Sequence, residues 1–320
     1  MSAVVPKEVP SLVVLLEYPR LKSEDPAMFA GTYTAIVTPF TAAGTLDEPA
    51  LKRLIEGQIK GGVDGIVPVG TTGESPTLDT DEHIRVIELA VQYSRRKLKV
   101  IAGTGANATA EAIQLTKRAE MAGADGSLQV APYYNRPTQE GLFQHFREIA
   151  RSTPLPILLY SIPGRCGVEI GVETCRRLSV ASRNIIGIKE AGGNADRVSQ
   201  LRAACGSKFI ILSGDDSLTL PFMSVGAEGV ISVASNVAPR AVADMVKAFA
   251  GGDVVKARKL HARYYPLFKD LFIESNPAPV KAALAMMGRM EETVRLPLVP
   301  LAAPSREILR ATLTAVGLLR

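Results

Sequence analysis

The sequence predicts an α/β fold: a TIM-type (β/α)8 barrel with a C-terminal helical appendage. Along this 320-residue chain, short runs of β-branched and aliphatic residues alternate with longer helical patterns. The alternation occurs eight times in about 220 residues, which is the spacing of a closed barrel, whereas an open doubly wound sheet usually has fewer strands. The 47% share of hydrophobic residues is enough to bury the large core that such a barrel needs.

Eight segments have the short, apolar pattern of strands that are buried on both faces. In chain order they are 34–37, 65–69, 99–102, 127–130, 157–160, 185–188, 209–212 and 229–233. The carboxyl ends of barrel strands all lie at one end of the barrel. Residues that directly follow these segments are therefore expected to share one mouth.

Helical patterns fill the intervals between the strands, and capping residues mark several of their ends. Asp79 or Thr80, Thr109 and Thr138 are N-cap candidates, because their side-chain oxygens can accept from the first free backbone N–H groups. Gly62 follows another helix, where a left-handed residue is expected. The helices predicted in this way include 48–60, 81–95, 109–121 and 139–151.

The two ends of the chain differ from the barrel region. Residues before Met28 are punctuated by proline and weakly patterned, so we expect either a disordered extension or a natural start at Met28. After the eighth β–α unit come three more helical stretches, near 254–272, 277–289 and 304–318. The expected organisation is an N-terminal extension at 1–27, the barrel at 28–251 and a C-terminal helical region at 252–320.

Composition limits the possible partners and the compartment. The net charge is +5, but Lys and Arg are scattered, and the densest group, at 256–263, reads as a solvated helix face. We therefore expect no nucleic-acid partner and no membrane partner, and a small anionic substrate is a better match for mild positive charge. No apolar run approaches the ~20 residues of a membrane span. Three cysteines without metal-type spacing favour free thiols in a reducing cytoplasm.

A lysine at the end of the sixth predicted strand is the most informative single residue. Lys189 follows the apolar run 185–188, so its stem would lie in a dry wall with the amine at the mouth. Burial penalises the charged form of a lysine, and only the neutral amine attacks a carbonyl. The alternative is a lysine that reaches solvent or pairs with Glu190.

Other strand-end residues accompany this lysine at the predicted mouth. They include Thr71 and Thr72 after the second strand, Tyr133 and Tyr134 after the fourth, Tyr160 and Arg165 at the fifth, and Asp215 and Asp216 after the seventh. An amine nucleophile, several hydroxyls and an arginine make a set suited to proton transfer and anion binding. His83, His145 and His261 form no metal-binding pattern, so we expect no metal site.

Several longer motifs make this chain resemble the dihydrodipicolinate synthase family, also called 4-hydroxy-tetrahydrodipicolinate synthase. They are GTTGES at 70–75, GTGANATAEA at 103–112, PYYNRP at 132–137, IIGIKEA at 185–191, LSGDD at 212–216 and GVISV at 229–233. The resemblance extends from about Met28 to the C-terminus and leaves only residues 1–27 uncovered. Motifs of this length in this order are highly specific.

The resemblance implies condensation of pyruvate with L-aspartate 4-semialdehyde, in the biosynthesis of diaminopimelate and lysine. Lys189 matches the lysine that forms a Schiff base with pyruvate, and that imine is the electron sink, so no cofactor is expected. Tyr160 matches the proton donor and acceptor, linked through Thr71 to Tyr134. In the family this second tyrosine enters the site from a neighbouring subunit.

The resemblance also implies residues that bind the two substrates. Thr72 and the backbone near Ile231 match positions that hold the pyruvyl carboxylate, and Arg165 matches the arginine that binds the semialdehyde carboxylate. Gly214 lies where the backbone is expected to approach the site closely. Ser161 and Cys166 depart from the residues common in the family, Asn and Thr, and we expect altered packing with intact chemistry.

Regulation and assembly follow from the same resemblance. Members that lysine inhibits bind it at a dimer interface, and the matching positions here are Ser75, His83, Asn107, Glu111 and Tyr133. Asn107 and Glu111 are also four residues apart at a helix start, where Asn107 could simply cap the helix. The family implies a homotetramer built as a dimer of dimers, with L-lysine as a possible inhibitor.

Two other functions stay open on the sequence alone. A sister class I aldolase, such as N-acetylneuraminate lyase or a 2-keto-3-deoxy sugar acid aldolase, shares the barrel, the lysine and the tyrosine at 160. The joint presence of Arg165 and Tyr134 favours the synthase over these enzymes. A catalytically silent lysine-binding barrel is the second alternative, and loss of the lysine or of the relay residues would be expected in it.

Overall fold

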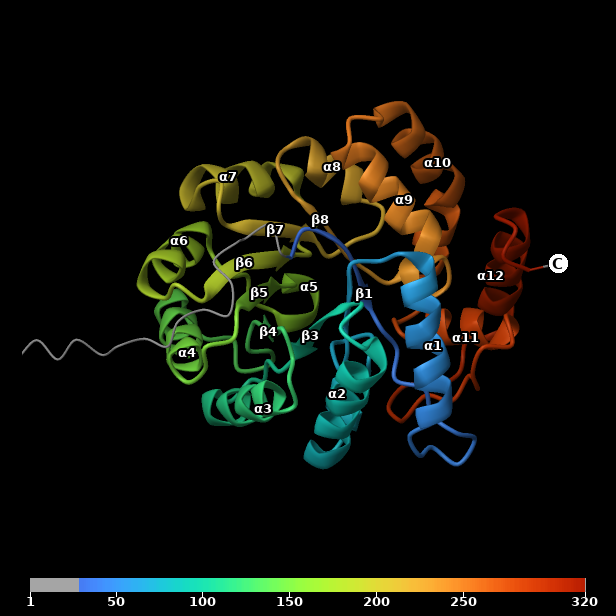
Figure 1. The fold of residues 1–320 in the computed structure, drawn as a ribbon, viewed down its shortest axis with the longest axis horizontal. Coiled ribbons are helices and arrows are strands. Elements are labelled where there is room, and N and C mark those ends of the chain that lie inside the picture. Colours follow the sequence, from blue (N-terminus) through green and yellow to red (C-terminus); the bar gives the residue numbers. More distant parts are fainter. Residues whose placement is uncertain (1–28, 320) are drawn as a thin grey trace, which may run out of the picture.

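A computed structural model describes residues 29–319 of the chain. Its centre is a closed barrel of eight parallel strands in the order β1 to β8, ringed by helices (Figure 1). The predicted fold class is thus confirmed. The predicted N-terminal extension at 1–27 lies outside the described residues.

Each strand pairs in parallel with the next along the chain, and β8 pairs with β1 to close the barrel. The strands are β1 Gly31–Ala35, β2 Gly65–Val67, β3 Lys99–Gly103, β4 Gly126–Val130, β5 Ile157–Ser161, β6 Ile185–Glu190, β7 Ile210–Ser213 and β8 Gly229–Ser232. At the closing seam Gly31 lies opposite Gly229, where an added Cβ would be 1.9 Å from the carbonyl oxygen of Gly31. Only glycine fits there.

Several strand ends differ from the prediction by one to three residues, and for the first two strands the reason is local. The first strand ends at Ala35 rather than Val37, because the N–H of Val37 donates to the side chain of Asn236 at 3.2 Å instead of to a strand. The second strand ends at Val67 because Pro68 has no N–H to donate and Val69 is left-handed, with φ 50°. The sixth extends two residues further than predicted, so that Lys189 lies inside it.

Helices cover the outside of the barrel. The main ones are α1 Glu48–Gly61, α2 Thr80–Ser94, α3 Thr109–Met121, α4 Gln139–Arg151, α6 Val172–Ala181, α7 Ala195–Cys205 and α9 Pro239–Ala250, with the short α5 Pro163–Cys166 and α8 Thr219–Ser224. Asp79 and Thr138 cap α2 and α4 as predicted, and Gly62 ends α1 in a left-handed conformation.

Capping of α3 was predicted wrongly. Its N-cap residue is Ala108, which provides no side-chain hydrogen bond. Thr109 is already inside the helix, and its hydroxyl lies 2.9 Å from Nδ1 of His145 on the neighbouring helix. Asn107 precedes this N-cap and donates to the main-chain oxygen of Tyr133 at 3.3 Å, so it does not cap α3.

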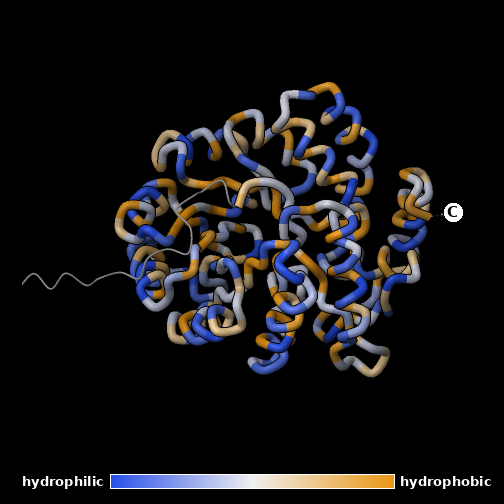
Figure 2. Tube along the Cα trace, in the orientation of Figure 1, coloured by the Kyte–Doolittle hydropathy of each residue, from blue (hydrophilic) through white to orange (hydrophobic). Residues whose placement is uncertain are grey.

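The core has an inner and an outer layer. Inside the barrel, side chains from alternate strand positions fill the centre, and they include Tyr33, Ile101, Leu158, Leu212 and Ile231. Between strands and helices lies a larger apolar layer, and the outer helices alternate between hydrophobic and hydrophilic residues (Figure 2). Packing of this kind holds the carboxyl ends of the strands in a fixed ring.

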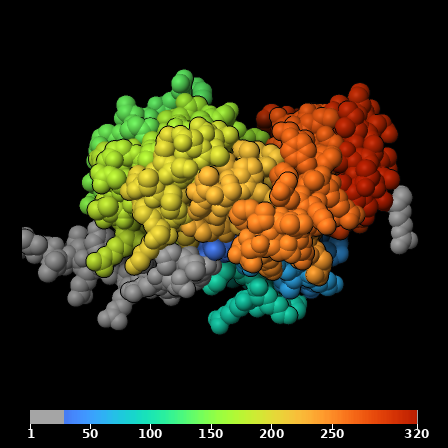
Figure 3. Space-filling model, turned by 90° about the horizontal axis from the view of Figure 1, so that it is seen from above, coloured from blue at the N-terminus to red at the C-terminus, as the bar shows by residue number. Residues whose placement is uncertain are grey.

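Three helices follow the barrel: α10 Val254–Asp270, α11 Ala278–Met286 and α12 Ala303–Ala315. They form a body at one end of the molecule (Figure 3), and their apolar residues belong to the same cluster as those of α1, α2 and α9. The division at residue 251 stays a prediction, although the core is continuous across it. Among residues 29–319, no helix is both long and apolar enough to cross a membrane.

Candidate active site

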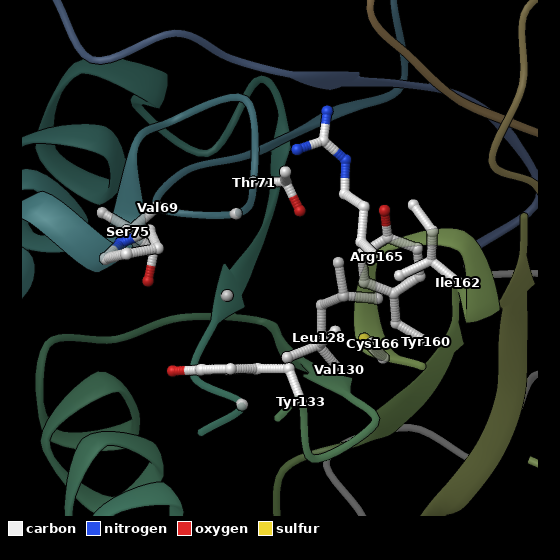
Figure 4. A pocket seen from close by; sticks show the side chains of 14 residues that line it. Val69, Thr71, Ser75, Leu128, Val130, Tyr133, Tyr160, Ile162, Arg165 and Cys166 are labelled. Carbon is white, nitrogen blue, oxygen red and sulfur yellow. The ribbon is translucent and has the colours of Figure 1, made fainter. Parts of the chain in front are cut away.

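A cavity of about 230 Å³ opens at the carboxyl ends of β2 to β5 (Figure 4). Its walls are Val69, Gly70, Thr71, Ser75, Pro76, Gly103, Gly105, Leu128, Val130, Tyr133, Tyr160, Ile162, Arg165 and Cys166. The wall is mostly apolar, with a few hydroxyl groups and one guanidinium. A pocket of this kind, at the mouth of a barrel, suits a small anionic substrate that is oriented by a few polar contacts.

Lys189 lies next to this cavity, on β6, where it is paired with Tyr160 of β5 and Leu212 of β7. Its side chain is 6% exposed, and its Nζ lies 4.1 Å from the centre of the Tyr160 ring. It has no carboxylate partner among residues 29–319. The alternative interpretations, reaching solvent or pairing with Glu190, do not describe this side chain.

The carboxylate of Glu190 is engaged elsewhere. It is fully buried and accepts from Nε of Arg197 at 2.8 Å and from the N–H of Gly192 at 2.7 Å. Burial raises the pKa of Glu190, and the Arg197 guanidinium opposes that shift. Arg197 also binds Glu169 at 3.1 Å, so this ionic group ties the end of β6 to α7 and directs Glu190 away from the lysine.

The loop after β7 presses against the lysine stem. At Gly214 an added Cβ would lie 3.1 Å from Cε of Lys189 and 2.6 Å from Cβ of Ala191. Glycine is therefore needed for this close approach, as predicted. Asp216, fully buried, accepts from Ser232 and from two backbone N–H groups after β8, and burial raises its pKa to about 6. This joins the loop to the strand that carries Ile231.

Only part of the predicted proton relay comes together in one chain. Tyr160 is almost fully buried and lines the cavity with Thr71, but no hydrogen bond joins the two in the described part of the chain. Tyr134 is 91% exposed and is absent from the cavity wall. Its backbone is left-handed, with φ 72°, which is uncommon for a residue with a side chain. The phenol is therefore held out from its own barrel.

The two predicted anion-binding side chains meet at one residue, Asn276. Thr72 is buried, and its Oγ1 accepts from Nδ2 of Asn276 at 3.0 Å. Arg165 stands at the mouth of the cavity and donates through Nη2 to the main-chain oxygen of Asn276 at 3.3 Å. Asn276 comes from the segment between α10 and α11, more than 200 residues from Thr72.

Two of the five predicted lysine-binding residues line the same cavity, and the other three lie near residues of its wall. Ser75 and Tyr133 line it, and Asn107 bonds to the main chain of Tyr133. His83 is buried on α2 with Nε2 2.9 Å from the oxygen of Gly103, and burial lowers its pKa to about 4. Burial also raises the pKa of Tyr133, and the exposed carboxylate of Glu111 adds to that shift.

The two residues that depart from the family pattern are both buried beside the site. Ser161 accepts from the N–H of Ile170 at 3.3 Å, and Cys166 lines the cavity. Burial raises the pKa of the Cys166 thiol to about 11 against the opposing effect of Arg165, so the thiol is neutral at pH 7. No group of three His, Cys, Asp or Glu residues within 29–319 is placed to hold a metal ion.

A model of the Dihydrodipicolinate synthetase family matches residues 28–316. The chain belongs to the dihydrodipicolinate synthetase family. The resemblance carried by the sequence motifs is thereby confirmed, over nearly the whole of the chain that the structure describes.

Relatives of this dihydrodipicolinate synthetase family member match about nine tenths of the chain. The 4-hydroxy-tetrahydrodipicolinate synthase of Syntrophus aciditrophicus (strain SB) is 55% identical over 292 residues, covering 91% of this chain and 100% of the relative. That of Sulfurihydrogenibium sp. (strain YO3AOP1) is 52% identical, covering 92% and 100%. The solved structure from Methylacidiphilum fumariolicum SolV is 58% identical with a TM-score of 0.89, covering 90% of this chain and 95% of that one.

Sequence reasoning missed the residues that support the site from the C-terminal region. Lys281 of α11 and Glu74 of the loop after β2 form an ion pair in which both side chains are 0% exposed. Glu74 also accepts from the N–H of Arg295 at 3.1 Å, and Arg295 binds Glu82 of α2. One signal was available: Lys281 is the only charged residue in the sequence of α11.

Proposed function

We propose that this chain condenses pyruvate with L-aspartate 4-semialdehyde, through an imine on Lys189, to give 4-hydroxy-tetrahydrodipicolinate for diaminopimelate and lysine biosynthesis. The observation that carries the proposal is the Lys189 amine, buried against Tyr160 without a carboxylate partner in residues 29–319, beside a cavity in this family's barrel. A solved relative from Acinetobacter baumannii, 44% identical, is complexed with pyruvate.

The chemistry follows from the amine. Neutral Lys189 adds to the keto carbon of pyruvate and loses water to give an imine. The protonated imine nitrogen withdraws electrons, so the methyl group gives up a proton and an enamine forms. The enamine carbon bonds to the aldehyde carbon of the second substrate. The amine of that substrate then displaces Lys189 as the ring closes, which restores the free lysine. The imine is itself the electron sink, and the proposal includes no cofactor.

The polar residues of the cavity would orient the two substrates. Thr72 and the backbone near Ile231 would hold the pyruvyl carboxylate. Arg165 would bind the semialdehyde carboxylate, and its position at the mouth supports this because the second substrate enters after pyruvate. Tyr160, which lines the cavity and packs its ring against Lys189, would carry protons through its hydroxyl during formation of the imine.

We propose that Tyr134 acts in the cavity of a neighbouring subunit, within a homotetramer. Its 91% exposure and left-handed backbone support this, because an exposed aromatic ring on a strained turn needs a partner surface. One solved relative, 43% identical, is described as a monomeric variant. Tyr134→Phe should lower turnover strongly while pyruvate still forms the imine. Wild-type turnover in that variant would remove Tyr134 from the relay.

The test of the main proposal combines turnover with trapping. The purified protein should consume pyruvate and the semialdehyde in an assay coupled to an NADPH-dependent reductase, and borohydride should fix pyruvate to Lys189. Lys189→Ala should abolish both, whereas Lys99→Ala, which removes an outlying partner of Asp125, should keep both. Trapping without turnover would indicate a sister aldolase, and neither would indicate a silent barrel.

Inhibition by L-lysine is a second proposed property. It is supported by the proximity of Ser75 and Tyr133 to Thr71 in one cavity, and by a solved relative from Cyanidioschyzon merolae, 41% identical, that has lysine bound. Lysine at millimolar concentration should slow the initial rate, and Glu111→Gln should weaken that effect. Glu88→Gln, on the surface of α2, is the matched control. Unchanged wild-type rates would end the proposal.

A further inference from the structure

The side-chain amide of Asn276 forms a hydrogen bond through its nitrogen and not through its oxygen, within the described residues. Its side chain is 5% exposed, and Nδ2 donates to Oγ1 of Thr72 at 3.0 Å, while Oδ1 has no hydrogen-bond partner in the described chain. Asn236, equally buried, contrasts with it: there Oδ1 accepts from Val37 and Nδ2 donates to the carbonyls of Ala35 and Val233. Most buried polar atoms are hydrogen-bonded, so Oδ1 of Asn276 is an exception within residues 29–319, whereas both ends of the Asn236 amide are paired.

The direction of this hydrogen bond fixes what the Thr72 hydroxyl can do. An amide nitrogen only donates, so it occupies a lone pair of Oγ1 and leaves the single hydroxyl proton unused. No acceptor for that proton is present among residues 29–319. The hydroxyl is therefore prepared to donate to an arriving acceptor, and a substrate carboxylate is one.

The same residue also reaches the second predicted anion-binding group. The main-chain oxygen of Asn276 accepts from Nη2 of Arg165 at 3.3 Å. The loop of Thr72 is held in register with this segment by the buried ion pair of Glu74 and Lys281, five residues beyond Asn276. Thr72 thus depends on the side chain of Asn276, whereas Arg165 depends on its backbone.

We propose that Asn276 is a positioning residue that sets the proton direction of the Thr72 hydroxyl, so that Thr72 donates to the carboxylate of the keto acid. The proposal rests on the proposed function, in which Thr72 holds pyruvate. It assigns the C-terminal helical region a part in substrate recognition, through a residue that does not itself contact the keto acid.

The direction of the Asn276–Thr72 hydrogen bond can be tested by replacing the Asn276 amide with a carboxylate, which has the same shape but can only accept. In Asn276→Asp the carboxylate can only accept, so it takes the Thr72 proton and places a negative charge near the substrate anion. We expect the pyruvate concentration for half-maximal borohydride trapping, and KM for pyruvate, to rise about ten- to hundredfold. Asn276→Ala frees the hydroxyl to rotate, and a rise of about three- to fivefold is expected.

Two comparisons separate positioning from a merely structural role. KM for the semialdehyde should change less than about threefold in both variants, because the main-chain oxygen that holds Arg165 is retained. In a Thr72→Val background, Asn276→Asp should add little further loss of pyruvate binding, because it acts through the hydroxyl. Asn184→Ala, which removes an amide bonded to three carbonyls far from the cavity, should lower stability and leave pyruvate binding unchanged.

The outcomes are distinct. The proposal would be overturned if KM for pyruvate rose equally in Asn276→Asp and Asn276→Ala. It would also be overturned if the losses of pyruvate binding caused by Asn276→Asp and Thr72→Val were fully additive. Loss of stability with unchanged pyruvate binding would make Asn276 purely structural. If the wild-type protein failed to trap pyruvate at all, the proposed function would fail first, and that result is read from the wild type before any variant. Circular dichroism and thermal unfolding establish that each variant is folded.

Discussion

Replacing Lys281 by methionine breaks one half of a buried ion pair and leaves the other half in place. The ammonium of Lys281 is fully enclosed between Glu74 and the Phe40 ring, whose centre is 4.2 Å away. Methionine keeps most of the volume of the stem, so the change mainly removes the charge. Glu74, 0% exposed, is then an uncompensated carboxylate in an apolar region.

The size of the effect follows from that burial. Removing one partner of a buried pair costs about 3–5 kcal/mol, and Glu74 has little means of relief, because its second oxygen already accepts from the N–H of Arg295. The full free energy of unfolding of a typical domain is only about 5–15 kcal/mol. Burial lowers the pKa of Lys281 to about 8 in spite of Glu74, so the charged lysine is itself costly to bury. Lys281→Met combined with Glu74→Gln should therefore recover most of the loss.

The assay is urea unfolding at pH 7 and a fixed protein concentration, followed by circular dichroism. Arg118→Met is the matched control. It removes the partner of Asp81 from a pair that is largely exposed, and it should cost less than about 1 kcal/mol. The argument that buried Glu74 requires the Lys281 ammonium would be refuted if Lys281→Met unfolded at the same urea midpoint as the wild type. It would also be refuted if the double variant were no more stable than Lys281→Met alone.

Two further predictions come from the site and from its supports. Gly214→Ala places a methyl group 3.1 Å from Cε of Lys189, so kcat and the rate of pyruvate trapping should fall at least about tenfold. Gly57→Ala is the control, because open space surrounds Gly57, and it should change neither rate. Equal rates in the two variants would contradict this prediction. Burial lowers the pKa of His145 to about 4 from 6.5, so the unfolded chain binds the extra proton and stability falls as the pH drops from about 6.5 to about 4. His145→Phe should remove about 3 kcal/mol of that acid loss, and an unchanged pH profile of unfolding would count against it.

The strand and helix pattern of the barrel could be read from the sequence because it depends on local periodicity. Thr71, Tyr160 and Arg165 line one cavity as expected, because each follows or ends a strand and the topology of a barrel brings those positions together. The predicted N-cap of α3 was wrong because of a tertiary contact: the hydroxyl of Thr109 is hydrogen-bonded to His145 on the next helix.

The supports of the site could not be read in the same way. Asn276 and Lys281 are separated from Thr72 and Glu74 by 204 and 207 residues, and no local pattern links them. A lone lysine in the apolar sequence of α11 indicated an unusual environment, but not its partner. Tyr134 is a similar case, since its ring is 91% exposed and no group among residues 29–319 covers it.

Because the chain is synthesised from its N-terminus, the contacts made by the C-terminal region can form only after the barrel has been synthesised. Every residue proposed for catalysis or substrate binding has been synthesised by position 231, but the groups that hold the loop of Thr72 and Glu74 are at 276, 281 and 295. A growing chain that has just completed the barrel carries Lys189 without the groups that hold the loop of Thr72 and Glu74 in place. It also exposes the apolar surface that α10 to α12 later cover. The loop that carries Thr72 and Glu74 thus gains its supporting contacts late in biosynthesis, when the final part of the chain leaves the ribosome.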